Sequence, residues 1–153
     1  MVEKLAEVLT QRGLTLSIAE SLTGGLLGHQ LTDCPGASNW FMGGITAYSN
    51  QAKIDLLEVG EETLNTYGAV SSEVAEEMVI GCAKKFRTKI ALSTTGIAGP
   101  AGGNQEKPVG LVYVGLNIAG QVWSKKCLFT GNRQEIKAQS SREAMVWLLE
   151  QLN

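Results

Sequence analysis

The sequence is short of the residues on which several common kinds of functional site depend. Its 153 residues include one histidine, three cysteines and three prolines. A Ser-His triad needs a histidine, and so do most catalytic zinc sites, so His29 would have to serve alone. Cys34, Cys82 and Cys127 are odd in number and form no CxxC pair. This pattern argues against a disulfide framework and against a zinc site.

The sequence also has no large net charge of either sign and no long apolar run. Lys and Arg number 13 and Asp and Glu number 15, for a net charge of -2, so no basic field is present to bind nucleic acid. No apolar run approaches the roughly 18 residues of a membrane-spanning helix. The charged N-terminal segment MVEKLAEVLTQRG does not resemble a signal peptide. We therefore expect a cytoplasmic protein with neither a nucleic-acid nor a membrane partner.

Alternating periodicities predict one α/β domain over residues 1–153, long enough to bury a core. The expected helices cover residues 2–12, 26–31, 51–57, 61–66, 72–86 and 134–152, and the expected strands cover 14–19, 40–48, 89–95, 109–118 and 122–129. The last two strands are joined by a short turn and form a hairpin. Helices that alternate with strands, together with one hairpin, indicate a layered α/β fold with a mixed sheet.

Eighteen glycines are present, and three segments combine glycines with polar groups at predicted strand ends, where open α/β sheets bind ligands. The first is the segment ESLTGG at 20–25. Its Ser21 can project a hydroxyl into a cleft, where amides of the following helix favour a phosphate or an oxyanion. Alternatively, Ser21 and Thr23 only cap that helix, and Gly24 and Gly25 only allow close packing.

The second segment, AYSNQAK, covers residues 47–53. If Asn50 caps the next helix, Lys53 lies in its first turn, where the helix dipole disfavours a positive charge. Such a lysine is either solvated at the surface or has its charged form disfavoured, and a neutral lysine can act as a general base. Tyr48 is expected to be a half-buried strand aromatic rather than an acid.

The third segment, TGIAGPAGG, covers residues 95–103. Its glycine spacing does not match GxGxxG, and no Gly-Lys-Ser/Thr follows, which excludes the Rossmann and Walker A motifs. Amides at Gly96 and Gly99 can still approach an anion closely, because the loop directly follows a strand. The alternative is a plain surface loop. Arg133, at the start of the last helix, would add a positive charge to an anion site.

The segments AESLTGG, AYSNQAK, GAVSSEVAEEM, TGIAGPAGG, EKPVGLVYVGL and the late GNR resemble, in order and spacing, the C-terminal domain of the CinA family. The resemblance covers essentially the whole chain. It implies a three-layer α/β/α sandwich with a mixed, mostly parallel sheet, assembled as a homodimer or a larger homo-oligomer. It also implies the activity of a nicotinamide-nucleotide amidohydrolase, which converts nicotinamide mononucleotide to nicotinate mononucleotide and ammonia without a metal or a cofactor.

The resemblance assigns a role to each matching residue. Ser21 would be the nucleophile, Lys53 its base, and Tyr48 a group that orients or relays. Thr95 would bind the carboxamide or help the oxyanion, and Arg133 would bind phosphate. The implied substrate site also includes Thr23, Gly24, Gly25, Asn50, Gly96 and Gly99. A Ser-Lys pair supplies the activated nucleophile and the base that metal-free amide hydrolysis needs. The alternatives are a non-catalytic nucleotide-binding module, acting as a sensor or partner subunit, and an amidase for another small amide.

The chain departs from the family pattern at three places. Leu22 follows the serine where the family often has cysteine, and GNR replaces the commoner GDR. Ser140 and Ser141 stand where small apolar residues are usual. None of these departures removes a proposed catalytic group.

Overall fold

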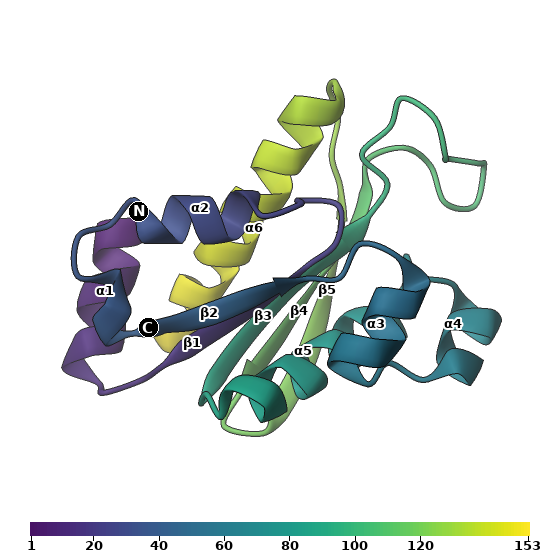
Figure 1. Cartoon of the computed structure of the whole chain (residues 1–153). Helices are drawn as coiled ribbons and strands as arrows, with labels where there is room; N and C mark the ends of the chain where they lie inside the picture. The colour runs from purple at the N-terminus through teal and green to yellow at the C-terminus, as the bar shows by residue number, and fades with distance from the viewer.

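A five-stranded sheet forms the centre of the computed structural model, which describes residues 1–153 (Figure 1). The helices are α1 (Val2–Gln11), α2 (Leu26–Thr32), α3 (Asn50–Leu57), α4 (Glu61–Tyr67), α5 (Ser72–Phe86) and α6 (Arg133–Leu152), with a short 3-10 turn at Ala37–Asn39. The strands are β1 (Leu16–Glu20), β2 (Phe41–Thr46), β3 (Ile90–Gly96), β4 (Leu111–Ile118) and β5 (Gln121–Leu128). Every helix and strand that the sequence predicts is present, with ends shifted by a few residues.

The strand order β2-β1-β3-β4-β5 brings three predicted site segments together at the carboxyl ends of β1, β2 and β3. β2 and β3 both run parallel to β1, whereas β4 is antiparallel to β3 and β5 is antiparallel to β4. Only β4 therefore opposes the common direction, which confirms a mixed, mostly parallel sheet. At the carboxyl end of β1, Glu20 pairs with Thr46 of β2 on one side and with Thr94 of β3 on the other.

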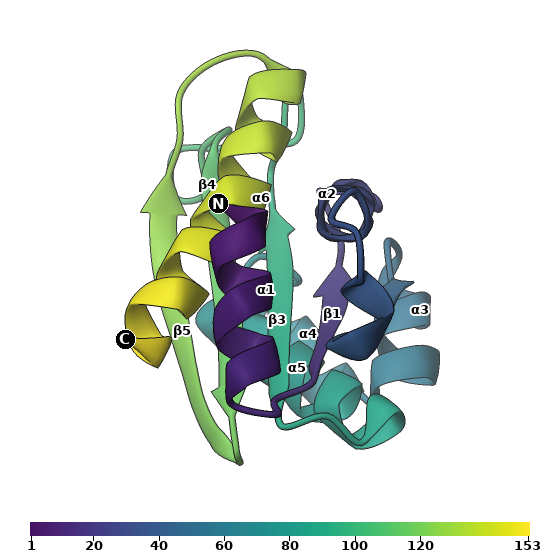
Figure 2. The same ribbon diagram turned by 90° about the vertical axis from the view of Figure 1, so that its left-hand side faces the viewer.

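The helices form one layer on each face of the sheet, as Figures 1 and 2 show. α1, α2 and α6 cover one face and α3, α4 and α5 cover the other. Alternate residues of β1 serve the two layers: Leu16 and Ile18 belong to the core under α1, α2 and α6, and Ala19 belongs to the core under α3, α4 and α5. The three-layer α/β/α sandwich is thus confirmed.

The buried stripe of α6 follows its helical spacing. Ile136, Ser140, Ala144, Leu148 and Leu152 are all buried. The hydroxyl of Ser140 donates to the Ile136 carbonyl oxygen one turn earlier, at 2.7 Å, and the hydroxyl of Ser141 donates to the Gln30 side chain. Both serines therefore satisfy their hydroxyls inside the core, as buried polar groups must.

The single histidine lies away from the strand ends that form the site. His29 is on α2 with 71% of its side chain exposed, 3.8 Å from Asp33, which confirms its expected place at the surface. All three cysteines are free. None of the helices combines the length and apolarity that crossing a membrane requires.

Candidate active site

A polar cavity of about 240 Å³ lies at the carboxyl ends of β1, β2 and β3. Seven of the residues that line it were singled out from the sequence: Ser21, Tyr48, Asn50, Lys53, Thr95, Gly96 and Arg133. Leu22, Ala69, Val70 and Ala98 complete the lining, which contains no carboxylate. A larger hollow of about 420 Å³ between α1, α2 and α6 has mainly apolar walls and contains none of the catalytic or substrate-binding residues expected from the sequence. No group of three or more His, Cys, Asp or Glu side chains is placed to hold a metal ion.

Lys53 and Ser21 form a buried pair in this cavity. The Nζ atom of Lys53 lies 2.9 Å from the Oγ atom of Ser21, and also 3.0 Å from the carbonyl oxygens of Ala47 and Tyr48. Lys53 is only 1% exposed and forms no ion pair. Of the two alternatives left open by the sequence, the structure therefore supports a lysine whose charged form is disfavoured, not a solvated one.

Burial without a counter-ion lowers the pKa of Lys53 from 10.5 to about 8. An appreciable fraction of the amine is therefore neutral near pH 7. A neutral amine has two N–H donors and one lone pair. With Ala47 and Tyr48 accepting the two N–H bonds, the lone pair faces the Ser21 hydroxyl. This arrangement suits a base that removes the serine proton.

Backbone pairing beyond the ends of the strands fixes the position of Ser21. Its amide donates to the Thr94 carbonyl oxygen at 2.9 Å, and the Ala47 amide donates to the Glu20 carbonyl oxygen at 2.9 Å. Side-chain alternation along β1 directs Ser21 toward the α3 face. Helix α3 begins at Asn50 after the cap residue Ser49, whose side chain accepts from the Ala52 amide. This start brings Lys53, in the first turns of α3, back toward Ser21.

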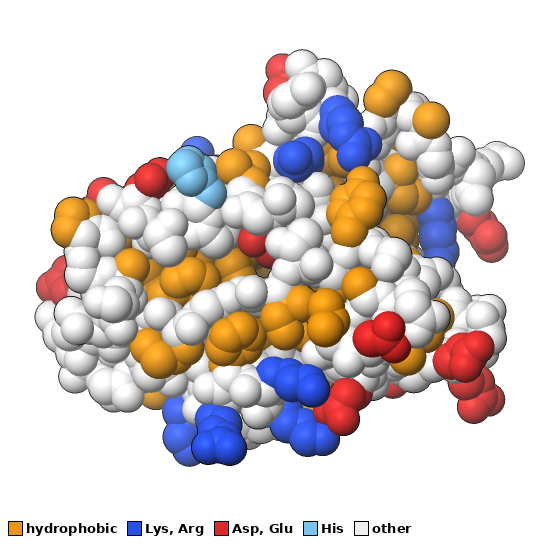
Figure 3. All heavy atoms as spheres, in the orientation of Figure 1, with side chains coloured by type: hydrophobic (Ala, Val, Ile, Leu, Met, Phe, Trp, Pro, Cys, Tyr) orange, Lys and Arg blue, Asp and Glu red, His pale blue; other side chains and the backbone are white.

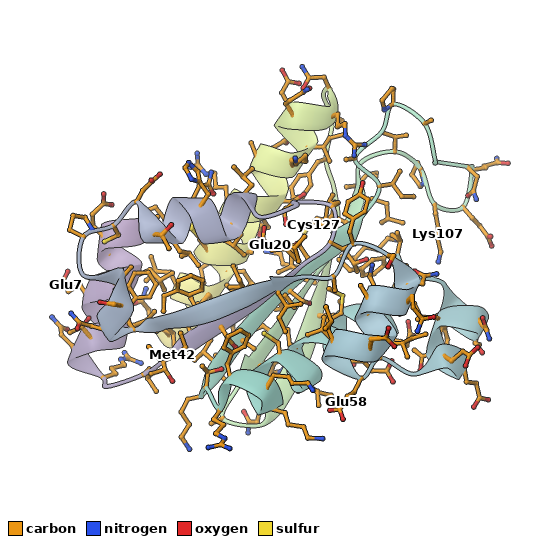
Figure 4. The ribbon with its side chains drawn as sticks, in the orientation of Figure 1. Glu7, Glu20, Met42, Glu58, Lys107 and Cys127 are labelled. Atoms are coloured by element: carbon orange, nitrogen blue, oxygen red, sulfur yellow. The ribbon has the colours of Figure 1, made fainter.

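Sequence reasoning missed the part played by Glu20. This carboxylate is 2% exposed and accepts hydrogen bonds from the amides of Leu27 at 2.9 Å and Gly28 at 3.1 Å. Figure 4 shows it between the sheet and α2. The expectation that the first turn of α2 serves an anion at Ser21 is wrong, because Glu20 already occupies that helix terminus. An acid directly before a predicted strand-to-helix turn was the available signal.

Three of the expected site residues belong to the turn between β1 and α2 and lie outside the cavity. Thr23 is fully buried, and its hydroxyl lies 2.7 Å from that of Thr94. Gly24 and Gly25 have φ angles of +59° and +103°, which glycine adopts readily. These three residues shape the turn but do not line the cavity. The cap residue of α2 is Gly25, and the amides of Leu27 and Gly28 donate to Glu20, so the alternative that Ser21 or Thr23 caps this helix is also wrong.

Two buried amides in the same turn have no partner within the chain. Leu22 is 4% exposed and Thr23 is fully buried, yet neither backbone N–H donates to a backbone or side-chain acceptor. Buried amides without an acceptor are rare in proteins. Leu22 lines the cavity directly after the serine, so its amide is available to an oxygen that gains negative charge during a reaction.

The mouth of the cavity joins three segments through Arg133. Its Nη1 donates to the Gly99 carbonyl oxygen at 2.7 Å, and its Nη2 donates to the Tyr48 hydroxyl at 3.1 Å. Gly99 therefore contributes to the mouth through its carbonyl, outside the cavity lining. Tyr48 lies in the loop after β2 and is 59% exposed, so its expected place as a half-buried strand aromatic is wrong.

Thr95 and the GNR segment at residues 131–133 are the remaining parts of the candidate site. The Thr95 hydroxyl donates to the Ala69 carbonyl oxygen at 2.7 Å, which leaves its oxygen free to accept a hydrogen bond. Asn132 caps α6: its side chain accepts from the Glu135 amide at 2.9 Å, and Glu135 accepts from the Asn132 amide at 2.9 Å. Asparagine and aspartate cap helices about equally well, so the GNR departure from GDR keeps the helix start intact.

Fold and site together define an α/β protein with a buried serine–lysine pair at the carboxyl ends of parallel strands. The family model for the CinA C-terminal domain matches residues 1–152. The chain belongs to this family.

Relatives over nearly the whole chain are named competence-damage inducible proteins. The chain is 49% identical over 152 residues to one from Clostridium kluyveri, covering 99% of this chain and 37% of that protein. It is 50% identical over 141 residues to one from Moorella thermoacetica, covering 92% and 34%. The chain thus spans just over a third of the length of these curated relatives.

Solved structures share the fold from end to end. Competence damage-inducible protein A from Klebsiella pneumoniae has a TM-score of 0.96 at 34% identity, covering 99% of this chain and 94% of that one. Competence/damage inducible protein CihA from Agrobacterium tumefaciens has a TM-score of 0.95 at 40% identity, covering 97% and 92%. Both matches independently support the topology described above.

Proposed function

We propose that this chain hydrolyses the carboxamide of nicotinamide mononucleotide, with Ser21 as nucleophile and Lys53 as base. The observation that carries the proposal is the 2.9 Å contact between Lys53 Nζ and Ser21 Oγ, in a buried site where the pKa of Lys53 is lowered to about 8. A structural lysine in such a position would be expected to pair with a carboxylate. The choice of substrate rests on the resemblance to nicotinamide-nucleotide amidohydrolases.

In the first step, Ser21 Oγ attacks the carboxamide carbon while its proton moves to Lys53 Nζ. The new ammonium is held by the carbonyl oxygens of Ala47 and Tyr48, which lie 3.0 Å from Nζ. The carbonyl oxygen of the substrate gains the negative charge. The unpartnered amide of Leu22, which lines the cavity, supplies a donor for it.

In the second step, the C–N bond breaks and Lys53 returns the proton to the leaving nitrogen, so ammonia departs and an ester on Ser21 remains. Water then attacks the ester carbon and gives a proton to Lys53. The C–O bond to Ser21 breaks, and the same proton restores the Ser21 hydroxyl. The product is nicotinate mononucleotide. One base therefore serves both halves of the reaction.

Two further groups orient the substrate in this proposal. The Thr95 oxygen, which keeps a free lone pair, accepts from the amide nitrogen of the substrate. Arg133 has N–H groups left after its bonds to Gly99 and Tyr48, and these bind phosphate at the mouth.

The test is ammonia release from nicotinamide mononucleotide by the unaltered protein and by Ser21→Ala and Lys53→Met. Turnover that both variants lose by at least about a thousandfold supports the Ser-Lys assignment. Ser38→Ala, at an exposed serine of the 3-10 turn, is the matched control and should retain activity. Retained activity in Ser21→Ala would exclude this nucleophile. Thermal stabilisation by the nucleotide without turnover would favour the non-catalytic binding module instead.

A further inference from the structure

Two cations at the beginning of α6 have no anionic partner in the protein. Arg133 and Lys137 are one helical turn apart, so their side chains lie on the same face. Neither forms an ion pair, and Lys137 forms no hydrogen bond although it is partly buried. The acid between them, Glu135, is engaged in the helix cap. Figure 3 shows Lys and Arg side chains beside the first turns of α6.

Their position is unfavourable unless an anion is bound there. The helix dipole disfavours cations near a helix start, and the protein as a whole has a net charge of only -2. Neither nearby helix terminus can hold the anion by itself. Asn132 and Glu135 close the start of α6, and the Glu20 carboxylate closes the start of α2. An anion here would therefore be held mainly by the two side chains.

Both cations adjoin the turn that begins with the nucleophile. Arg133 lines the cavity beside Ser21. Lys137 Nζ lies 3.9 Å from the position that a Cβ atom would take at Gly24. The amine of Lys137 therefore lies against this turn. The amide of Gly25 donates to no acceptor within the chain and is a further donor in this turn.

We propose that Lys137 and Arg133 together bind the phosphate of the nucleotide, and that Lys137 makes the site selective for a phosphorylated ligand. The inference rests on the proposed function, because it assumes that the other end of the ligand reaches Ser21. A guanidinium grips phosphate through paired N–H donors and an ammonium adds a point charge, so the two act together. Arg133 keeps its bonds to Gly99 and Tyr48 and binds the phosphate through its remaining N–H groups.

The experiment compares nicotinamide mononucleotide with nicotinamide riboside, which lacks the phosphate. We expect Lys137→Gln to lower kcat/KM for the mononucleotide about tenfold and to leave kcat/KM for the riboside unchanged. Lys137→Arg should retain most of the preference. Lys4→Gln, at an exposed lysine of α1, removes the same charge away from the site and should change neither value. Equal losses for both substrates, or no loss for either, would overturn the proposal.

A binding measurement separates this proposal from the proposed function. If the unaltered protein releases no ammonia, thermal stabilisation by the mononucleotide and by the riboside is compared in the same variants. Stabilisation that needs the phosphate and disappears in Lys137→Gln supports the subsite even without turnover. If inorganic phosphate alone gives the same Lys137-dependent shift, the subsite binds phosphate regardless of its source. Stabilisation unaffected by Lys137→Gln, or none by the mononucleotide, would refute it.

Discussion

Lys53 Nζ meets Ser21 Oγ at 2.9 Å although the two residues are 32 positions apart in the sequence. The contact depends on the Ala47 amide, which donates to the Glu20 carbonyl oxygen and joins the end of β2 to the end of β1. The base and the nucleophile are therefore held by the sheet itself. Disturbing either strand end should affect the pair directly.

Amide hydrolysis should rise with pH through the pKa of Lys53. Only the neutral amine accepts the Ser21 proton, and burial lowers the pKa of Lys53 to about 8. We therefore expect kcat/KM to increase from pH 6.5 and to level off above an apparent pKa near 8. Initial rates of ammonia release across this range provide the measurement. A rate that stays flat or falls between pH 7 and 9 would argue against Lys53 as the base.

The free energy of unfolding should also depend on pH through the lowered pKa of Lys53. Because the pKa of Lys53 is lower in the folded protein than in the unfolded chain, the unfolded chain binds more protons between pH 8 and 10.5. The free energy of unfolding therefore rises with pH in that window, by roughly 3 kcal/mol, and this term is constant below it. The measurement is urea unfolding of the unaltered protein and of Lys53→Met, each at pH 7 and at pH 10. The change with pH in the difference between their unfolding free energies gives the contribution of Lys53. An unchanged difference between the two proteins would show that Lys53 is not desolvated.

Replacing Glu20 by glutamine should weaken both fold and activity. The buried carboxylate accepts two amides of α2, and an amide side chain would turn an NH₂ group toward one of them. We expect a loss of about 1–3 kcal/mol in unfolding free energy and a lower kcat, because the turn that holds Ser21 loosens. Glu62→Gln, at an exposed position of α4, is the control. If Glu20→Gln unfolds at the same urea concentration as the unaltered protein, Glu20 does not anchor α2.

Gly81 should prove essential to the placement of α3. A Cβ atom at this position of α5 would lie 1.8 Å from the Leu57 carbonyl oxygen at the end of α3. Gly81→Ala therefore forces α3 away from α5, with an overpacking loss of about 1–3 kcal/mol, and shifts Lys53 relative to Ser21. The expected result is a lower melting temperature together with reduced ammonia release. Helix propensity alone favours alanine over glycine, so a lower melting temperature in Gly81→Ala reports the clash with α3.

The sequence was sufficient to locate the strand ends that carry the site. Glycines and polar groups after three predicted strands pointed to Ser21, Lys53 and Thr95, and parallel pairing brought these residues together. The burial of Lys53 was not predictable, because it depends on how α3 packs against β1 and α5. A lysine in an isolated helix turn has the same local pattern whether it is solvated or enclosed.

The positions of Thr23 and Lys137 were also not predicted, because they too depend on tertiary packing. Thr23 was expected at the substrate, but its partner Thr94 lies 71 residues away and only the assembled sheet reveals their contact. Lys137 was not singled out because its nearness to Gly24 arises from packing between α6 and the turn after β1. The cytoplasmic location and the homo-oligomeric assembly stay predictions.

The pleat of β1 places two chemically different side chains on opposite faces of the sheet. Glu20 and Ser21 are neighbours in the chain, yet one faces α2 and the other faces Lys53 on the opposite side of the sheet. A carboxyl group and a base that must lose its positive charge thus lie on opposite faces of the sheet. A one-residue insertion or deletion within β1 would exchange the two faces. It would put a carboxylate against Lys53, keep the amine protonated, and leave an uncharged hydroxyl at the start of α2.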